Sequence, residues 1–177
     1  MRQRWMGWML LSAAIVLTVL YHARNALATP SVGFTGTTLA VGRFGEISVF
    51  NTFIPPNSRQ NWRKKDLWLS WQKTKGSSDL YVRDNTWAPG GSTGWHTHPG
   101  HNLIIVTPGT VTAYEGDDPE CKPSVYTTGM GFVDPGGDHE HIIRNEGAVD
   151  AKTIAVQLIP AGQPRRIDVA DPGNRTF

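Results

Sequence analysis

Residues 91–102 read GSTGWHTHPGHN and place three histidines, His96, His98 and His101, close together. A second window, residues 135–141, reads PGGDHEH and adds His139 and His141. The two windows hold five of the six histidines of this 177-residue chain. Because imidazole is the commonest protein ligand for transition metals, these windows are where we expect the chemistry of the protein.

Two histidines separated by one residue on a strand can bind the same metal ion. Alternate residues of an extended strand face the same side, which puts His96 and His98 together with Cα atoms about 7 Å apart. His139 and His141 repeat this spacing. A lone histidine is usually exposed or satisfied in the core, but two such pairs predict a metal site. We expect one divalent transition metal, Fe, Mn, Zn, Ni or Cu, rather than Mg or Ca, which prefer oxygen ligands.

The rest of the chain predicts an all-β fold. Glycine and proline recur every few residues and separate short runs of β-branched and aromatic residues. Many short strands indicate a sandwich or barrel, because closure removes exposed sheet edges. We allow one short helix, residues 57–65. The expected strands are 38–41, 46–53, 67–71, 79–87, 102–107, 110–114, 125–127, 131–134, 139–144 and 153–159.

Residues 1–28 have the pattern of a secretory signal peptide. Arg2 and Arg4 precede an uncharged run, residues 5–21, and the triplet Ala26-Leu27-Ala28 follows. Cleavage after Ala28 would export a single domain, residues 29–177, to the periplasm or the exterior. The alternative is a membrane anchor, since residues 5–21 approach the roughly 18 to 20 residues needed to span hydrocarbon. The short run and the well-placed triplet favour cleavage.

The charge and cysteine content exclude several functions. Removing the three leader arginines leaves 17 − 3 = 14 basic against 15 acidic side chains, a formal charge of −1. The sequence therefore argues against a nucleic-acid partner, and we expect the Arg63-Lys64-Lys65 run to be a solvated face. Cys121 is the only cysteine. No internal disulfide can form, and its acidic surroundings disfavour a reactive thiolate, so we expect a small, partly buried side chain.

The histidine windows resemble the two motifs of the cupin family. Residues 91–109 are similar to the first motif and residues 129–145 to the second, with an interval of roughly 20 residues that is typical of the family. The resemblance covers residues 79–160. It implies a small antiparallel, jelly-roll-like β-barrel that holds a divalent metal and often forms a homodimer. It also implies that the metal ligands are His96, His98 and His141.

One departure from the cupin pattern concerns the ligand set. The first motif normally carries a glutamate ligand four residues after its second histidine, where this chain has Asn102. Three neutral histidines leave the local charge near +2 instead of +1, which makes the ion a stronger Lewis acid. No Asp or Glu near the histidine windows has the strand phase to face the metal. His101 is expected beside the ligands, as an extra ligand or a proton shuttle.

The doubled histidine of the second window is another departure. His141 has the family's spacing to Asn145, so we take it as the ligand and His139 as a pocket residue on the same face. Trp95, directly before His96, is expected in the pocket wall. The other tryptophans considered, Trp62, Trp68, Trp71 and Trp87, are expected to pack in the core or the pocket wall. Five more side chains could touch the site, but turn and surface roles are favoured for them: Tyr114, Glu115, Arg144 and the Arg165-Arg166 pair.

Two functions remain open at this point. A three-histidine site with open positions suits an Fe(II) oxygenase resembling a dioxygenase, or a metal-dependent isomerase acting on a small organic substrate. The alternative is a non-catalytic module that binds a small ligand or metal. The sequence contains no Gly-x-Ser-x-Gly elbow, phosphate-binding loop or dinucleotide fingerprint, which argues against serine hydrolases and nucleotide-dependent enzymes.

Overall fold

The computed structural model describes residues 28–54, 67–174 and 177, and this part of the chain contains strands and no helix. The all-β prediction is therefore confirmed. The expected helix at 57–65 lies outside the described residues, as does Trp62. Nothing in the described ranges forms a helix long and apolar enough to cross a membrane. The strands are β1 (Val32–Phe44), β2 (Ser48–Phe53), β3 (Trp68–Lys73), β4 (Ser78–Ser92), β5 (His96–Thr97), β6 (Asn102–Val106), β7 (Thr110–Glu115), β8 (Ser124–Thr127), β9 (Gly131–Asp134), β10 (His141–Arg144), β11 (Ala151–Pro160) and β12 (Ile167–Asp168).

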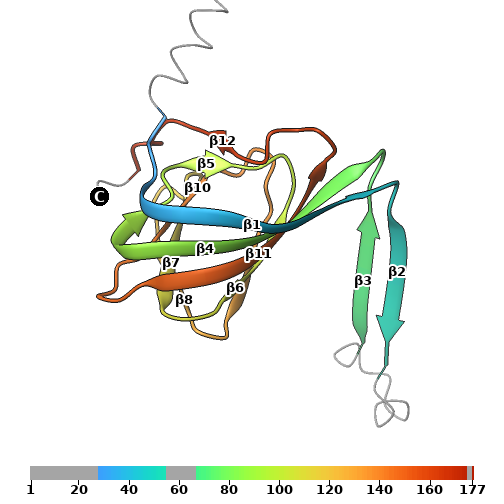
Figure 1. The fold of residues 1–177 in the computed structure, drawn as a ribbon, viewed down its shortest axis with the longest axis horizontal. Helices are drawn as coiled ribbons and strands as arrows, with labels where there is room; N and C mark the ends of the chain where they lie inside the picture. The colour runs from blue at the N-terminus through green and yellow to red at the C-terminus, as the bar shows by residue number, and fades with distance from the viewer. Residues whose placement is uncertain (1–27, 55–66, 175–176) are drawn as a thin grey trace, which may run out of the picture.

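Ten of these strands form one antiparallel sheet that curls into a nearly closed barrel. The order β12-β5-β10-β4-β11-β6-β9 runs around it, with β1 paired to β4 and β7 paired to both β10 and β8. In Figure 1 the long strands β1, β4 and β11 lie side by side across the barrel. This is the antiparallel, jelly-roll-like barrel that the sequence predicts.

Strand β4 is longer than the sequence suggests. The strand predicted at residues 79–87 continues in the structure to Ser92, where β4 pairs with Arg144 of β10. Gly91 permits this, because a Cβ at this position would lie 2.6 Å from the carbonyl oxygen of Gly33. The glycine therefore allows β1 and β4 to approach closely instead of ending the strand.

The core lies inside the barrel and in a second cluster next to it. Along β6 the buried residues Ile104 and Val106 alternate with exposed Leu103, as expected for a sheet with one covered face. Buried residues form one cluster around Trp87, which is 1% exposed, and another around Trp95, which is 0% exposed. The expectation that Trp87 packs in the core or the pocket wall agrees with its place in the first cluster.

Strands β2 and β3 form a separate two-stranded sheet that extends away from the barrel (Figure 1). Phe50 pairs with Trp71, and Phe53 pairs with Trp68. The expectation that Trp68 and Trp71 pack in a core is wrong, since they are 57% and 69% exposed. The physical reason is that the hairpin pairs only with itself in the described structure, so no sheet or loop covers its faces.

Candidate metal centre

Three histidines meet inside the barrel. His96 on β5 is the direct partner of His141 on β10, and His98 follows two residues later. The centroid of the His96 ring lies 4.9 Å from that of the His98 ring and 4.3 Å from that of the His141 ring. One nitrogen from each ring lies within 4.8 Å of the others. The pairing of two strands thus converts two sequence windows into one cluster.

Backbone carbonyls determine which ring nitrogen of two histidines is free. Nδ1 of His96 lies 2.9 Å from the carbonyl oxygen of Gly94, and Nδ1 of His98 lies 2.7 Å from that of Arg165. A carbonyl oxygen can only accept, so each Nδ1 carries the proton and donates it. The lone pair of each ring is therefore on Nε2, where it can bind a metal ion.

The three rings are buried, and burial keeps them neutral. Exposed fractions are 4% for His96, 8% for His98 and 3% for His141. Burial lowers the pKa of His96 well below its ordinary value, and the neighbouring histidines and Arg166 lower it further, because a second positive charge beside them would be repelled. Burial also lowers the pKa of His98, and that of His141 to about 4. Neutral, converging imidazoles are the form that metal binding requires, so this donor set fits a divalent transition metal.

A cavity of about 70 Å³ adjoins the three rings inside the barrel. Phe34, Trp87 and Ile104 supply apolar wall, and Gln157 and Asn102 supply amide groups. The Oε1 atom of Gln157 is buried and has no hydrogen-bond partner among the described residues. A mostly closed cavity with a few convergent polar groups is the usual form of a small-molecule site.

Arginines also line this cavity. Arg83 on β4 is 8% exposed, and its guanidinium donates to Oγ1 of Thr38 at 2.6 Å. No carboxylate of the described residues lies within ion-pair distance of Arg83 or Arg165. Burial lowers the pKa of both side chains, and each repels its arginine neighbour. The cavity wall is therefore cationic.

This arrangement corrects the expectation for the Arg165-Arg166 pair. Both residues line the cavity, although Arg166 also forms the expected ion pair, with Asp168 at 2.5 Å. The loop that leads into β12 carries them there, and β12 pairs with β5. Sequence reasoning did not single out Arg83, which has no motif around it. Its only signal was a basic residue in the middle of a strand.

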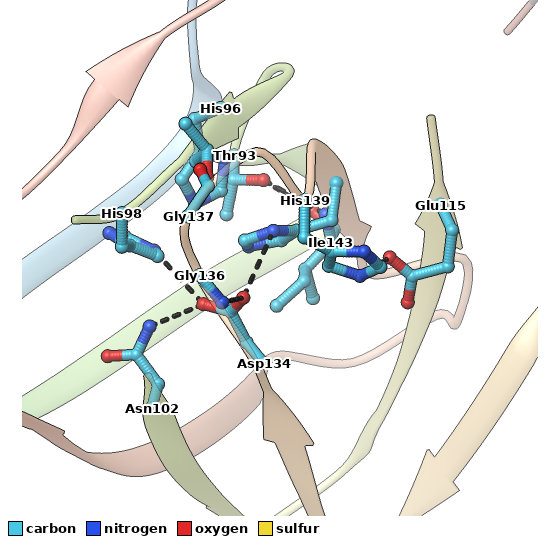
Figure 2. Close-up of polar contacts among 12 residues, drawn as sticks. Thr93, His96, His98, Asn102, Glu115, Asp134, Gly136, Gly137, His139 and Ile143 are labelled. Carbon is cyan, nitrogen blue, oxygen red and sulfur yellow. Dashed lines mark hydrogen bonds and ion pairs between the residues drawn. The ribbon is translucent and has the colours of Figure 1, made fainter. Parts of the chain in front are cut away.

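A carboxylate lies beside the histidines, contrary to the expectation that none would. Asp134 ends β9, and its register partner on β6 is Asn102. Nδ2 of Asn102 donates to Oδ2 of Asp134 (Figure 2). The carboxylate is 4% exposed and lies 3.5 Å from Nε2 of His98 and 3.6 Å from Nδ1 of His141. Asp134 is the last residue of the predicted strand 131–134, but its register with β6 could not be read from the sequence.

His139 and His101 do not line the cavity. Nε2 of His139 lies 2.5 Å from Oε2 of Glu115 (Figure 2), and the ring of His139 stacks beside that of His141, with ring centroids 6.2 Å apart. Strand β10 begins only at His141, so His139 lies in the preceding loop and does not share its strand phase. His101 is half-buried, and its carbonyl accepts from the backbone N–H of Leu158 at 3.1 Å.

Trp95 lies on the opposite side of the sheet from the cavity. It packs with Tyr114, Cys121 and Ile142 in the second core cluster. Neighbouring residues of an extended chain face opposite sides, so Trp95 points away from the cavity where His96 points into it.

Two other residues considered in the sequence lie outside the cavity. Cys121 is fully buried. Arg144 lies 3.7 Å from Glu146, which is the ion pair that the sequence favoured.

Comparison with known proteins points to one family. Residues 85–157 match the family model for the Cupin domain, and the three histidines fall inside this span. The matched span covers less than half of the 177-residue chain. No curated protein matches the sequence.

Several solved structures are similar to parts of the chain. A cupin superfamily protein from Desulfitobacterium hafniense shares 19% identity over 45% of this chain and 67% of that chain, with a TM-score of 0.40. The polyketide cyclase RemF from Streptomyces resistomycificus shares 21% over 52% and 64%, with a TM-score of 0.44. An oxalate oxidase in complex with glycolate shares 24% over 50% and 45%, with a TM-score of 0.42. The match thus spans less than half of the oxalate oxidase chain.

Proposed function

We propose that this chain is a metal-dependent cupin enzyme in which His96, His98 and His141 hold one divalent transition metal and the adjoining cavity takes a small organic anion. The observation that carries the proposal is the set of three buried rings with nitrogen atoms within 4.8 Å of one another. A bound ion would supply Lewis acidity, or O₂ activation if it is Fe(II). Fe, Mn, Zn, Ni and Cu are all compatible with these donors.

The chain's own residues prepare the site for this chemistry. The carbonyl groups of Gly94 and Arg165 hold two rings by their Nδ1–H groups, which orients each Nε2 atom. The barrel wall excludes bulk water from the rings, and interactions with a charged substrate are stronger where water is excluded. Holding the donors in place before binding reduces the cost of organising the site.

The arginines support an anionic substrate. Arg83 and Arg165 present guanidinium groups that no carboxylate of the described structure pairs, and a planar guanidinium matches a carboxylate with two hydrogen bonds. The cavity is about 70 Å³, against roughly 150 Å³ for a cavity that holds benzene. A small carboxylic acid fits this size. A substrate hydroxyl could donate to the unpaired Oε1 of Gln157.

Metal analysis of purified protein tests the ligand set. We expect the wild-type protein to retain about one equivalent of divalent metal, and His96→Ala and His141→Ala to lose it. His101→Ala is the matched control, because His101 does not line the cavity. Unchanged metal content in His96→Ala and His141→Ala, with circular dichroism showing folded protein, would rule out the proposed centre.

Turnover separates an enzyme from a binding module. We expect Fe(II)-loaded protein to consume O₂, or another metal form to isomerise substrate, with at least one member of a panel of small carboxylic acids. Ligand binding without turnover across that panel would favour the binding module. Arg83→Met should weaken binding of the acid by roughly 10- to 100-fold, the loss of one charge-assisted contact. Arg43→Met is the control, since Arg43 pairs with Asp79 outside the cavity.

We further propose that the protein is exported after cleavage at Ala28. Thr29 would then begin the mature chain, and its Oγ1 atom accepts from the backbone N–H of Trp95 at 2.6 Å. This contact would survive cleavage after Ala28. N-terminal sequencing of protein from the periplasm or medium is expected to start at Thr29, whereas an intact residue 1 in the membrane fraction would support an anchor formed by residues 5–21.

A further inference from the structure

The large apolar side chains of the β2–β3 hairpin are exposed in the described structure. Their exposed fractions run from 47% for Val49 to 69% for Trp71. An exposed apolar surface of this kind marks an interaction site, because covering it releases water and is favourable. We propose, independently of the metal centre, that the end of this hairpin far from the barrel docks on the surface of an anionic lipid bilayer.

Apolar side chains occur on both faces of the hairpin. Phe50 lies opposite Trp71, and Phe53 lies opposite Trp68. Successive residues of a strand face opposite sides, so these two aromatic pairs, three residues apart, lie on opposite faces. A folded partner protein would cover one face and leave the other in water. A lipid surface that the end of the hairpin enters contacts both faces at once.

The apolar residues continue to the end of the hairpin. Strand β2 ends at Phe53 and is followed by Ile54, and Leu67 precedes Trp68, the first residue of β3. These four residues, here called the hairpin tip, are between 42% and 57% exposed. The hairpin extends away from the barrel, so no described strand of the barrel covers the tip (Figure 1). Tryptophan beside aliphatic residues is typical of protein surfaces at the membrane–water boundary.

Two lysines lie at the opposite end of the hairpin, next to the barrel. Lys73 is the register partner of Ser48, and Lys75 follows in the connection to β4, with both lysines exposed. No ion pair joins either lysine to a carboxylate of the described residues. Glu46, at the same end, accepts from the backbone N–H of Gly76 at 3.1 Å and offsets part of this charge. Lysines held beside a membrane in this way are attracted by anionic headgroups.

The geometry of a hairpin limits the docking to the surface layer of the bilayer. The outer edges of a two-stranded sheet carry unpaired backbone groups, which cannot enter hydrocarbon. Surface-bound elements bury apolar side chains about 5 to 10 Å deep. Lys73 lies five residues from Trp68, about 17 Å along the strand. An upright hairpin would thus hold Lys73 roughly 7 to 12 Å outside the membrane boundary, close to the Debye length of about 8 Å at physiological salt.

A fluorescent label at the tip tests this contact. The full-length Trp68→Cys chain is labelled with the environment-sensitive dye NBD and mixed with vesicles of phosphatidylcholine and phosphatidylglycerol. Cys121 is 0% exposed, so the folded protein is labelled at the new cysteine. We expect a blue shift of the NBD emission and quenching by lipids with a nitroxide on the acyl chain. Val149→Cys is the matched control, 68% exposed in the loop before β11, and should show neither change.

Paired lysine substitutions test the role of charge. In the labelled Trp68→Cys chain, Lys73→Ala/Lys75→Ala should raise the lipid concentration for half-maximal quenching by about 10- to 30-fold, from roughly fivefold for each lysine. Lys122→Ala/Lys152→Ala removes the same charge from exposed positions outside the hairpin and should raise it by less than about threefold. Vesicles of phosphatidylcholine alone should bind the tip as weakly as anionic vesicles bind the Lys73→Ala/Lys75→Ala chain.

Three results would overturn the assignment of a bilayer to the tip. The first is equal NBD spectra for labels at Trp68 and Val149 in the presence of vesicles, and the second is equal effects of the two lysine pairs. The third is a blue shift of the tip label that rises with protein concentration in the absence of lipid, with a dimer seen by sedimentation, because the hairpin would then pack on a second copy of this chain. Circular dichroism and metal content of every variant should match wild type, since none of the substituted residues lines the cavity.

Discussion

At the scale of single residues, burial sets the protonation of the site. Folding removes the rings of His96, His98 and His141 from water, which lowers the pKa of each. In the unfolded chain these rings would regain their ordinary pKa near 6.5. The same burial that prepares the donors for a metal therefore makes the folded protein sensitive to acid in the absence of metal.

We predict that metal-free protein loses stability as the pH falls below 6.5. Above that pH the rings are neutral in both states, so they contribute no pH dependence. Between 6.5 and about 4, the folded-state pKa of His141, the unfolded chain binds protons that the folded chain rejects, and the free energy of unfolding falls. Each such ring contributes up to about 1.4 kcal/mol per pH unit.

Urea unfolding at pH 7.5, 6.5, 5.5 and 5.0 measures how steeply the free energy of unfolding falls with pH. His141→Gln should make this pH dependence weaker, because the variant lacks one ring that binds a proton in the unfolded chain but not in the folded protein. His101→Ala should not, since His101 does not line the cavity. Equal slopes in wild type and His141→Gln would contradict the prediction.

At the scale of elements, the loop between β9 and β10 holds the first histidine window in place. The backbone N–H of Gly137 donates to the carbonyl of His98 at 2.7 Å, and Oγ1 of Thr97 donates to the carbonyl of Gly137 at 2.7 Å. Gly136 and Gly137 both have positive φ, at 67° and 70°. A Cβ on Gly136 would overlap the backbone of Gly100, whereas one on Gly137 would meet nothing within 4 Å.

This difference predicts different costs for two similar substitutions. Gly137→Ala should lower the free energy of unfolding by about 1 to 2 kcal/mol, the cost of a left-handed backbone for alanine. Gly136→Ala should cost a further 1 to 3 kcal/mol or so, because the backbone of the first window must move. It should also weaken metal binding, whereas Gly137→Ala should not. Urea unfolding and metal titration check both, and equal effects of the two variants would refute this account.

At the scale of the whole molecule, the barrel and the β2–β3 hairpin contribute differently to stability. Trp87 is 1% exposed in the barrel core, whereas Trp71 on the hairpin is 69% exposed. The hairpin pairs only with itself in the described structure, and an isolated two-stranded hairpin is marginally stable. We therefore expect the barrel to carry the cooperative unfolding transition.

Replacing each of these two tryptophans with alanine tests whether the barrel, and not the hairpin, carries the cooperative unfolding transition. Trp87→Ala should lower the free energy of unfolding by about 3 to 5 kcal/mol, through lost burial and a cavity. Trp71→Ala should change it by less than about 0.5 kcal/mol, as exposed sites usually do. Both are measured by urea unfolding followed by circular dichroism. A loss above 2 kcal/mol for Trp71→Ala would mean that the hairpin is part of the cooperative unit.

Local patterns in the sequence predicted most strands and the shared face of His96 and His98, but not the position of His139 in the loop before β10. The recurrence of glycine and proline limits strand length, and alternation along a strand is a property of the backbone itself. Both signals lie within a few residues, so they predicted most strands and the faces of His96 and His98. Two short strands, β5 and β12, were missed because they are only two residues long.

Only the tertiary structure decided which distant residues share the site. Asp134 faces Asn102 because β9 pairs with β6, and Arg83 and Arg165 line the cavity because β4 and the loop before β12 close around it. The exposure of Trp68 and Trp71 likewise depends on the hairpin leaving the barrel. Residue type and local spacing determine which way a side chain faces along its own strand. What it meets there depends on the register and closure of the sheet, which arise from contacts between segments far apart in the sequence.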